Sequence, residues 1–171
     1  MQHLISNLLD MNQIDQKKIS IVPQKINLHD FLNRLEKNFD SQARKKNIEL
    51  KIDKIEANIN TDQHALSSVL ENLISNALKF SPKGKSVYLK TYLEDGSVHF
   101  AVVDQGPGIA EDELPLLFKK FSRLTNKPTD NETSNGLGLA IAKELTDLLR
   151  GKILVTSRRG KGSTFTLVIP Q

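Results

Sequence analysis

Two amides and a lysine share one side of a segment with helical periodicity, in the stretch ENLISNALKF. Asn72 and Asn76 are four residues apart and Lys79 follows three residues later, so their side chains lie on or close to one helix face. Amide oxygens are suitable ligands for Mg²⁺, which takes other ligands from water and substrate phosphates, and a lysine can contact a phosphate. The alternative is a solvated polar face, and this helix alone favours that alternative.

A second cluster is the stretch VVDQGPGI, in which Asp104 ends an expected strand. Gly106 and Gly108 would allow positive φ angles and a close approach of a ligand to the backbone. A carboxylate at this place can accept a hydrogen bond from an exocyclic amine such as adenine N6. A plain Asp-x-Gly turn is the alternative interpretation.

Two further clusters contain paired glycines. In NGLGLAIAKEL, Gly136 and Gly138 bracket the start of a helix, where free backbone N–H groups favour an anion such as phosphate. The spacing matches neither the dinucleotide fingerprint nor the P-loop. In RRGKGSTFTL, glycines flank a lysine in a turn that is followed by a serine and a threonine. Taken singly, neither cluster distinguishes a ligand site from a structural turn.

The elements that must position these clusters follow from periodicity. We expect a helix from Leu4 to Asp15 and a linker or edge strand within Ile19–Leu28. We also expect a helix with Asp30 as a possible N-cap, and one that begins at Thr61 or Asp62. The other expected elements are the strands IELKID and ANIN, a hairpin around residues 94–97, a short helix in AEDELPLLFKKF, a loop over 126–135, a helix from GLGLAIAKEL to Arg150, and a closing pair of strands.

This order predicts an α/β (α+β) two-layer sandwich, in which helices pack on one face of a mixed, largely antiparallel sheet. The other face would need charged residues, which the lysines and arginines of the strands could supply. The 171 residues suffice for one domain of ordinary size. There is no cysteine and the net charge is only +4. Aromatic residues make up 5% of the chain, too few for a base-stacking surface, so we expect no nucleic-acid partner.

Together and in this order, the clusters resemble the catalytic ATP-binding domain of bacterial two-component sensor histidine kinases. The wider superfamily includes gyrase B, the heat-shock chaperone ATPase and the mismatch-repair ATPases. The resemblance runs from about Asn27 to Pro170 and implies the Bergerat-type ATP-binding fold. HALSSVLENLISNALKFSPKG resembles the family's N box, DQGPGI its G1 box, LFKKFSRL its F box, GLGLAIAKEL its G2 box and GKGSTFTL its last glycine box.

The resemblance implies a role for each matching residue, with ATP or ADP and Mg²⁺ as cofactors. Asn76 would be the metal ligand, Asp104 would bind the adenine amine with support from Thr164, and Phe118 and Phe121 would anchor one end of a lid over 124–135. Asn72, Lys79 and Arg123 would be the catalytic residues. The nucleotide-binding residues would be Asn72, Asn76, Lys79, Phe80, Asp104, Gly106, Gly108, Ile109, Phe121, Gly136, Leu137, Gly138, Leu139 and Thr164. The sequence departs from the family's pattern at Gln105, where Asn is common, and at Asn135, where Gly or Thr is frequent.

The activity implied is phosphoryl transfer. Hydrolases of the superfamily place a glutamate at the position of Asn72, whereas kinases usually have Asn there. None of the four histidines is followed by the family's acceptor pattern, so the γ-phosphate would go to a histidine N-terminal to Met1 or on another chain, and from there to a response-regulator aspartate. We therefore expect no self-phosphorylation of this chain alone.

The expected domain division follows the same resemblance. Residues 1–15 resemble the tail of a dimerisation-hairpin helix, 16–26 form a linker or edge strand, and 27–171 form the ATP-binding domain. Partners would be the dimerisation and histidine-phosphotransfer domain, a second copy in the full-length protein, and a receiver domain. The location would be the cytoplasmic side of a membrane-bound sensor. The alternatives are a nucleotide-binding regulatory or scaffold module without phosphotransfer, and an anti-sigma-factor-type serine kinase.

Overall fold

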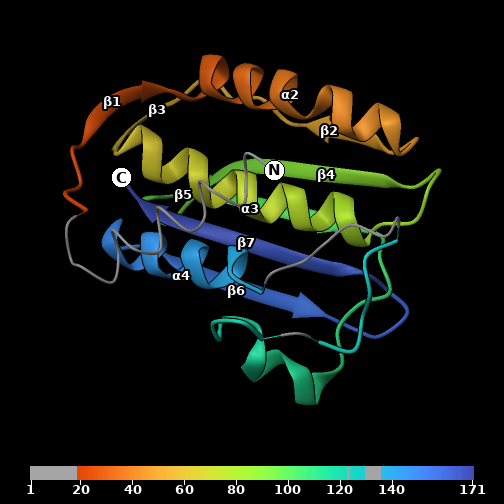
Figure 1. Cartoon of the computed structure of the whole chain (residues 1–171). Helices are drawn as coiled ribbons and strands as arrows, with labels where there is room; N and C mark the ends of the chain where they lie inside the picture. Colours follow the sequence, from red (N-terminus) through yellow and green to blue (C-terminus); the bar gives the residue numbers. More distant parts are fainter. Residues whose placement is uncertain (1–18, 123, 130–135) are drawn as a thin grey trace.

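The computed structural model describes residues 19–122, 124–129 and 136–171 (Figure 1). The expected helix over Leu4–Asp15 and the side chain of Arg123 lie outside these described residues. The elements are β1 (Gln24–Asn27), α2 (Leu28–Lys45), β2 (Glu49–Ile52), β3 (Asn58–Thr61), α3 (Gln63–Phe80), β4 (Ser86–Glu94), β5 (Ser97–Asp104), the 3₁₀ helix η1 (Glu111–Leu116), α4 (Gly138–Leu148), β6 (Lys152–Ser157) and β7 (Ser163–Pro170).

Five strands form the main sheet in the order β2-β4-β5-β7-β6. The β2–β4 pair is parallel, and the other three pairs are antiparallel. Figure 1 shows α3 and α4 lying along one side of this sheet, with α2 beside them. The prediction of two layers and a mixed, largely antiparallel sheet is confirmed. A separate two-stranded sheet pairs β1 with β3, so the expected edge strand is attached to the part of the chain that follows Asn27.

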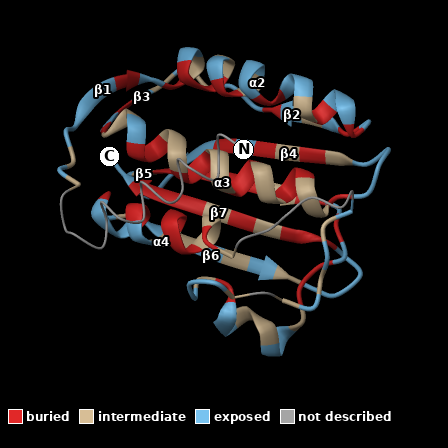
Figure 2. Ribbon diagram, viewed as in Figure 1, coloured by how far each residue is buried: buried red, intermediate tan, exposed pale blue. Residues whose placement is uncertain are grey.

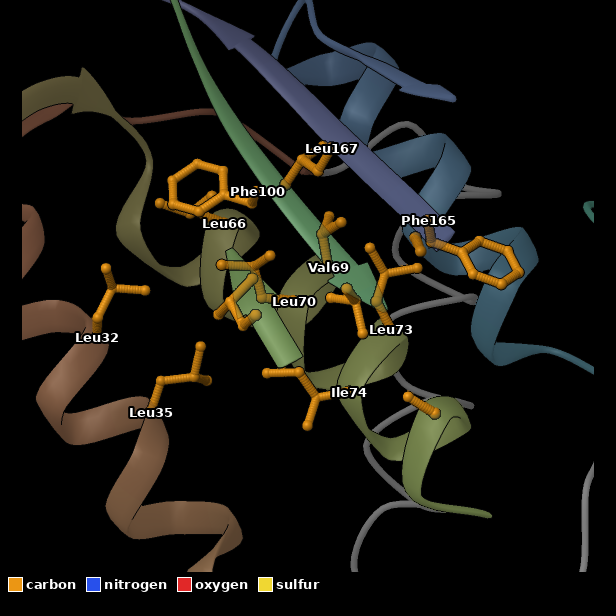
Figure 3. Packing of buried hydrophobic residues seen from close by; sticks show 14 of the residues in the cluster. Leu32, Leu35, Leu66, Val69, Leu70, Leu73, Ile74, Phe100, Phe165 and Leu167 are labelled. Carbon is orange, nitrogen blue, oxygen red and sulfur yellow. The ribbon is translucent and has the colours of Figure 1, made fainter. Parts of the chain in front are cut away.

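The apolar face of α3 forms the centre of the core. The apolar residues along this face are buried, and Leu70, Ile74 and Leu78 have no measurable exposure. These side chains pack between α2 and the sheet (Figure 3), and Figure 2 shows buried and exposed residues along α2 but mainly buried and intermediate residues along α3. Because α3 is held along its whole length, the polar residues on its remaining face have fixed positions. The labelled core residues of Figure 3 come from α2, α3, β5 and β7: Leu32, Leu35, Leu66, Val69, Leu70, Leu73, Ile74, Phe100, Phe165 and Leu167.

Side-chain caps fix where the two long helices begin. α2 begins one turn earlier than expected: Asn27, not Asp30, is its N-cap and accepts a hydrogen bond from the Asp30 N–H at 2.9 Å. Of the two expected starts of α3, Thr61 and Asp62, it is Asp62 that caps the helix, accepting from the Ala65 N–H at 2.9 Å. Its second oxygen accepts from the Val22 N–H at 2.8 Å. The chain that enters β1 is therefore tied to the first turn of α3.

The sheet face away from the helices is only partly charged. Lys51, Lys90 and Lys152 are exposed there, as predicted, but Leu154 is 48% exposed and Tyr92 is 41% exposed. The expectation that lysines and arginines would supply this face is therefore met only in part. Among the described residues, no helix combines the length and the apolar character needed to cross a membrane.

Candidate nucleotide site

Asp104 is a buried carboxylate at the end of the central strand β5. Its side chain is 7% exposed, and Oδ1 accepts hydrogen bonds from the backbone N–H groups of Gly106 at 2.8 Å and Ser163 at 3.2 Å. Burial raises the pKa of Asp104, because the charged form loses its hydration, and the hydrogen bonds from Gly106 and Ser163 oppose this rise. Asp104 is thus an oriented acceptor in a poorly hydrated place.

Ser163, and not Thr164, is the residue of the last glycine box that contacts Asp104. The two residues are direct partners in the β5–β7 ladder. Side chains alternate along a strand, so Thr164 projects to the opposite face, where it pairs with Val103 and Thr156. The register therefore does not place the Thr164 hydroxyl beside Asp104, and a contact of Thr164 with a nucleotide stays a prediction. Sequence spacing could not decide between two adjacent hydroxyl residues without the register of β7.

Glycines bring three backbone segments against Asp104. A Cβ placed on Gly162, which has φ +83°, would lie 2.1 Å from the Asp104 carbonyl oxygen. A Cβ on Gly106 would lie 2.9 Å both from Asp104 Oδ1 and from the carbonyl oxygen of Phe80. The end of α3, the turn after β5 and the turn before β7 therefore meet at one place, which any larger residue would force apart.

Asn72 lies against the start of α4. Its Nδ2 donates to the Ser68 carbonyl oxygen at 2.9 Å, and a Cβ on Gly138 would lie 2.7 Å from its Oδ1. The N-cap of α4 is Leu137, whose side chain cannot accept a hydrogen bond, and the first turn contains no acidic residue. No side chain of the cap or the first turn therefore neutralises the first N–H groups of this helix, and these groups and the helix dipole can attract an anion. Asn76 follows one turn later on α3.

The segment 124–129, which we call the lid segment, joins the turn after β5 to the end of α3. The Asn126 Nδ2 donates to the Gly108 carbonyl oxygen at 2.6 Å. The Thr129 N–H donates to the Lys79 carbonyl oxygen at 3.1 Å. These two bonds place the lid segment beside Gly108 and Lys79. The remainder of the predicted lid, 130–135, lies outside the described residues.

Phe118 and Phe121 behave differently from each other. Phe118 packs against the core, but the Phe121 side chain is 70% exposed and its φ is +60°. Phe121 therefore does not anchor the lid by packing. Its backbone N–H donates instead to the Gly136 carbonyl oxygen at 2.9 Å, which closes the base of the loop between them.

Ile109 is buried in the turn after β5, and its N–H donates to Ser157 Oγ at 2.8 Å. This bond fixes the turn to the β6 side of the sheet. The contacts expected for Ile109, Phe80, Leu139 and Asn76 with a nucleotide stay predictions. So do the phosphate contact of Lys79 and the metal contact of Asn76.

Glu71, next to Asn72, is engaged elsewhere. Its Oε1 accepts a hydrogen bond from Ser67 Oγ at 2.9 Å, one turn back on α3. Adjacent helix residues are separated by about 100° around the axis, so Glu71 does not occupy the position of Asn72. No general base for water is found at the place where a hydrolase of this fold would carry one.

The donor set suits a cation that is held mainly by phosphate. Over residues 19–122, 124–129 and 136–171, no group of three or more His, Cys, Asp or Glu residues could bind a metal ion. The Asn72 amide oxygen lies against Gly138 at the start of α4, and Mg²⁺ typically pairs one or two protein oxygens with waters and substrate phosphates. The residues present therefore fit Mg²⁺ that arrives with a nucleotide.

The comparisons with known proteins agree with this geometry. The family model "Histidine kinase-, DNA gyrase B-, and HSP90-like ATPase" matches residues 61–171. The aerobic respiration control sensor protein ArcB of Escherichia coli K12 is 34% identical over 174 aligned residues, which cover 98% of this chain and 22% of ArcB. The autoinducer 2 sensor kinase/phosphatase LuxQ of Vibrio vulnificus YJ016 is 35% identical over 175, covering 98% of this chain and 20% of LuxQ.

The crystal structure of full-length ShkA in complex with AMPPNP has a TM-score of 0.83 and 29% identity, covering 98% of this chain and 36% of ShkA. The chain spans about a fifth of the length of the curated relatives named above. The extent of the family match and the agreement in fold lead to one assignment: the chain belongs to the histidine kinase-, DNA gyrase B- and HSP90-like ATPase family, as an ATP-binding domain of the histidine kinase type.

Proposed function

We propose that this chain binds ATP or ADP with Mg²⁺ and donates the γ-phosphate of ATP to a histidine outside these 171 residues. The observation that carries the proposal is the state of Asp104, a buried carboxylate fixed by two backbone N–H groups and surrounded by backbone that only glycine permits. A charged side chain in such surroundings is expected where it recognises a ligand. An adenine amine is a donor of the right kind, and the AMPPNP complex of ShkA supports a nucleotide.

The phosphate end of the site would lie between α3 and α4. Asn72 and Asn76 offer amide oxygens, Lys79 offers a cation, and the first N–H groups of α4 offer donors beside Gly138. Bound Mg²⁺ would supply charge neutralisation at the phosphates. The protein groups would hold the triphosphate in line with the acceptor, since catalysis of phosphoryl transfer rests mainly on positioning and on charge stabilisation.

Asn72 and its neighbour Glu71 favour kinase chemistry over hydrolysis, because neither provides a general base for water at the position of Asn72. The Asn72 amide cannot act as a general base for water, and the Glu71 carboxylate accepts a hydrogen bond from Ser67. The relatives named as sensor proteins and kinases support phosphotransfer to histidine and then to a response regulator. In this proposal, the acceptor is presented by a dimerisation domain, in a homodimeric sensor whose ATP-binding domain faces the cytoplasm.

Titration calorimetry with ADP and Mg²⁺ tests the nucleotide site. We expect saturable binding that is lost in Asp104→Ala and unchanged in Asp112→Ala, an exposed acidic residue on η1. No heat at millimolar ADP would refute nucleotide binding. Equal affinity of Asp104→Ala would refute the role of Asp104.

Phosphotransfer is tested separately with γ-labelled ATP. Alone, the chain should gain no stable label, and addition of a dimerisation domain with an acceptor histidine from a relative should give label on that domain. Label on the chain itself would contradict the proposal. Nucleotide binding without transfer to any acceptor histidine would favour the regulatory or scaffold alternative, and transfer to a serine would favour the anti-sigma-factor-type kinase.

A further inference from the structure

Lys46 is a buried charged residue that has no role in the proposed function. Among the residues that the structure describes, the ionisable side chains classed as buried are those of Asp104 and Lys46, and Lys46 is 4% exposed. Withdrawing an ammonium group from water is costly unless its donors find acceptors. Lys46 is the C-cap residue of α2, yet its side chain reaches α3 and the lid segment.

Among the described residues, Leu78, Lys79 and Thr129 offer acceptors to the Lys46 ammonium. Nζ donates to the carbonyl oxygens of Leu78 at 2.6 Å and Lys79 at 3.1 Å, and to Thr129 Oγ1 at 3.0 Å. Both carbonyls belong to the last turn of α3, where carbonyl groups lack helical partners and the helix dipole attracts a cation. A single side chain of α2 therefore connects the end of α3 with the lid segment.

Thr129 completes this connection. Its N–H donates to the Lys79 carbonyl oxygen at 3.1 Å. Its hydroxyl lies 3.0 Å from the same oxygen and 3.2 Å from the carbonyl oxygen of Ser81. The hydroxyl has one proton, so it donates to one of these two oxygens while it accepts from Lys46. Removing the ammonium would leave Thr129 with weaker attachments to α3.

The other end of the lid segment has its own attachments. Thr125 donates twice to Glu113 Oε1, from its N–H and its hydroxyl, each at 2.7 Å. Asn126 donates to the Gly108 carbonyl oxygen. The segment is therefore held at η1, at the turn after β5 and at the end of α3, and the contacts of Lys46 with Thr129 and the Lys79 carbonyl group belong to the last of these.

We propose that Lys46 is a positioning residue of the nucleotide site, which fixes the lid segment to the last turn of α3 without contacting the nucleotide. The inference rests on the proposed function, because this turn carries Lys79 and Phe80, the residues expected at the phosphates and the base. Lys46 donates a hydrogen bond to the carbonyl oxygen of Lys79. Loss of its ammonium would loosen both the lid segment and the turn from which those side chains extend.

The test compares Lys46→Met, which keeps the length of the side chain without its charge, with Lys45→Met, its exposed neighbour on α2. Thr129→Val removes the hydroxyl, whereas Thr129→Ser keeps it. Hydrogen exchange of the Thr129 amide is measured in nucleotide-free protein, and calorimetry gives the affinity for ADP with Mg²⁺. We expect Lys46→Met and Thr129→Val each to speed exchange at Thr129 and to weaken ADP binding about tenfold. Lys45→Met and Thr129→Ser should stay within about twofold of the unaltered chain.

The double variant separates positioning from general destabilisation. If Lys46 acts through Thr129, Lys46→Met with Thr129→Val should bind ADP no more weakly than the weaker single variant, because contacting residues are not additive. Additive losses, or faster exchange with unchanged affinity, would overturn the proposal. Thr129 is exposed, so its variants carry the test if Lys46→Met fails to fold. If the unaltered chain does not bind ADP, the proposed function fails as well, and the exchange rates still report whether Lys46 holds Thr129.

Discussion

In the proposed function, Asp104 binds the nucleotide with a carboxylate that has lost much of its own hydration. Burial raises its pKa, so the charged form is less favourable in the folded chain than in the unfolded chain. Asn has nearly the same shape and can still accept from the Gly106 and Ser163 N–H groups, but it carries no charge and offers donors as well as an acceptor.

We therefore expect Asp104→Asn to separate stability from binding. Its free energy of unfolding at pH 7 should equal or exceed that of the unaltered chain, while ADP affinity falls about a hundredfold or more. Urea unfolding and calorimetry measure the two quantities, with Asp112→Asn as the control. A loss of several kcal/mol in Asp104→Asn would show that the charge is structural.

The same variant carries a pH dependence whose sign follows from the raised pKa. Stability from protonated Asp104 is fully present below the pKa of an unfolded Asp and is lost as the pH rises through the raised folded pKa. The stability of Asp104→Asn relative to the unaltered chain should therefore increase with pH across this window. Urea unfolding at a series of pH values checks it, and a difference that shrinks with pH would contradict it.

Ser163 and Thr164 give a matched pair for the identity of the hydroxyl. Ser163→Ala removes a side chain on the Asp104 side of β7, whereas Thr164→Val changes the opposite face with almost no change of shape. We expect Ser163→Ala to weaken ADP binding several-fold, consistent with one lost hydrogen bond, and Thr164→Val to leave it within about twofold. The reverse order in calorimetry would support the role first assigned to Thr164.

The sequence alone could not predict which residue of this pair faces Asp104. The box GKGSTFTL predicts a strand, and the alternation of its side chains is certain. Which of two neighbouring hydroxyl residues faces Asp104 depends on the pairing of Asp104 with Ser163, which lies 59 positions away. The Lys46 cluster escaped prediction for a similar reason, since its acceptors are backbone oxygens that no residue type signals.

At the scale of elements, the contact between α3 and α4 depends on a missing side chain. Ala has the higher helix propensity, so Gly138→Ala should favour α4 locally. Its Cβ would lie 2.7 Å from Asn72 Oδ1, so the Asn72 side chain must turn away. We expect the free energy of unfolding to change by less than about 1 kcal/mol, because a flexible side chain yields.

ADP affinity of Gly138→Ala should nevertheless fall, because the displaced amide no longer faces the helix start. Glu144→Ala, an exposed change on the same helix, is the control for helix propensity alone. Calorimetry and urea unfolding measure the effect. Unchanged affinity would remove Asn72 from the site.

The elements themselves were largely predictable. α3 and the β4–β5 hairpin have strong periodicity, and the Asp95-Gly96 turn has both residues at positive φ, as a two-residue hairpin requires. The start of α2 was predicted too late, because Asn27 and Asp30 are both good N-cap residues. The burial of Leu28 places that residue inside the helix and makes Asn27 the cap. The open sheet face, with Tyr92 and Leu154 exposed among lysines, follows from the tertiary arrangement and not from strand pattern.

At the scale of the whole molecule, the core on α3 sets the global stability. Leu70→Ala should lower the free energy of unfolding by about 3 kcal/mol, because it leaves a cavity at a fully buried site. Leu148→Ala, at a site 42% exposed, should cost less than about 1 kcal/mol. ADP with Mg²⁺ at a hundred times its dissociation constant should return about 2.7 kcal/mol to Leu70→Ala. Thermal unfolding with and without ligand checks both values, and no shift with ligand would contradict folded-state binding.

The pairing of β5 with β7 has a consequence for a chain that is still being made. Asp104 leaves the ribosome long before Ser163, the residue whose N–H it accepts, and α4 lies between them in the sequence. Until β7 has been synthesised, β5 lacks one of its two neighbours and Asp104 lacks half of its backbone donors. A nascent or truncated chain that stops before residue 163 therefore lacks part of the proposed adenine site and has an unpaired strand edge, the kind of surface that chaperones bind.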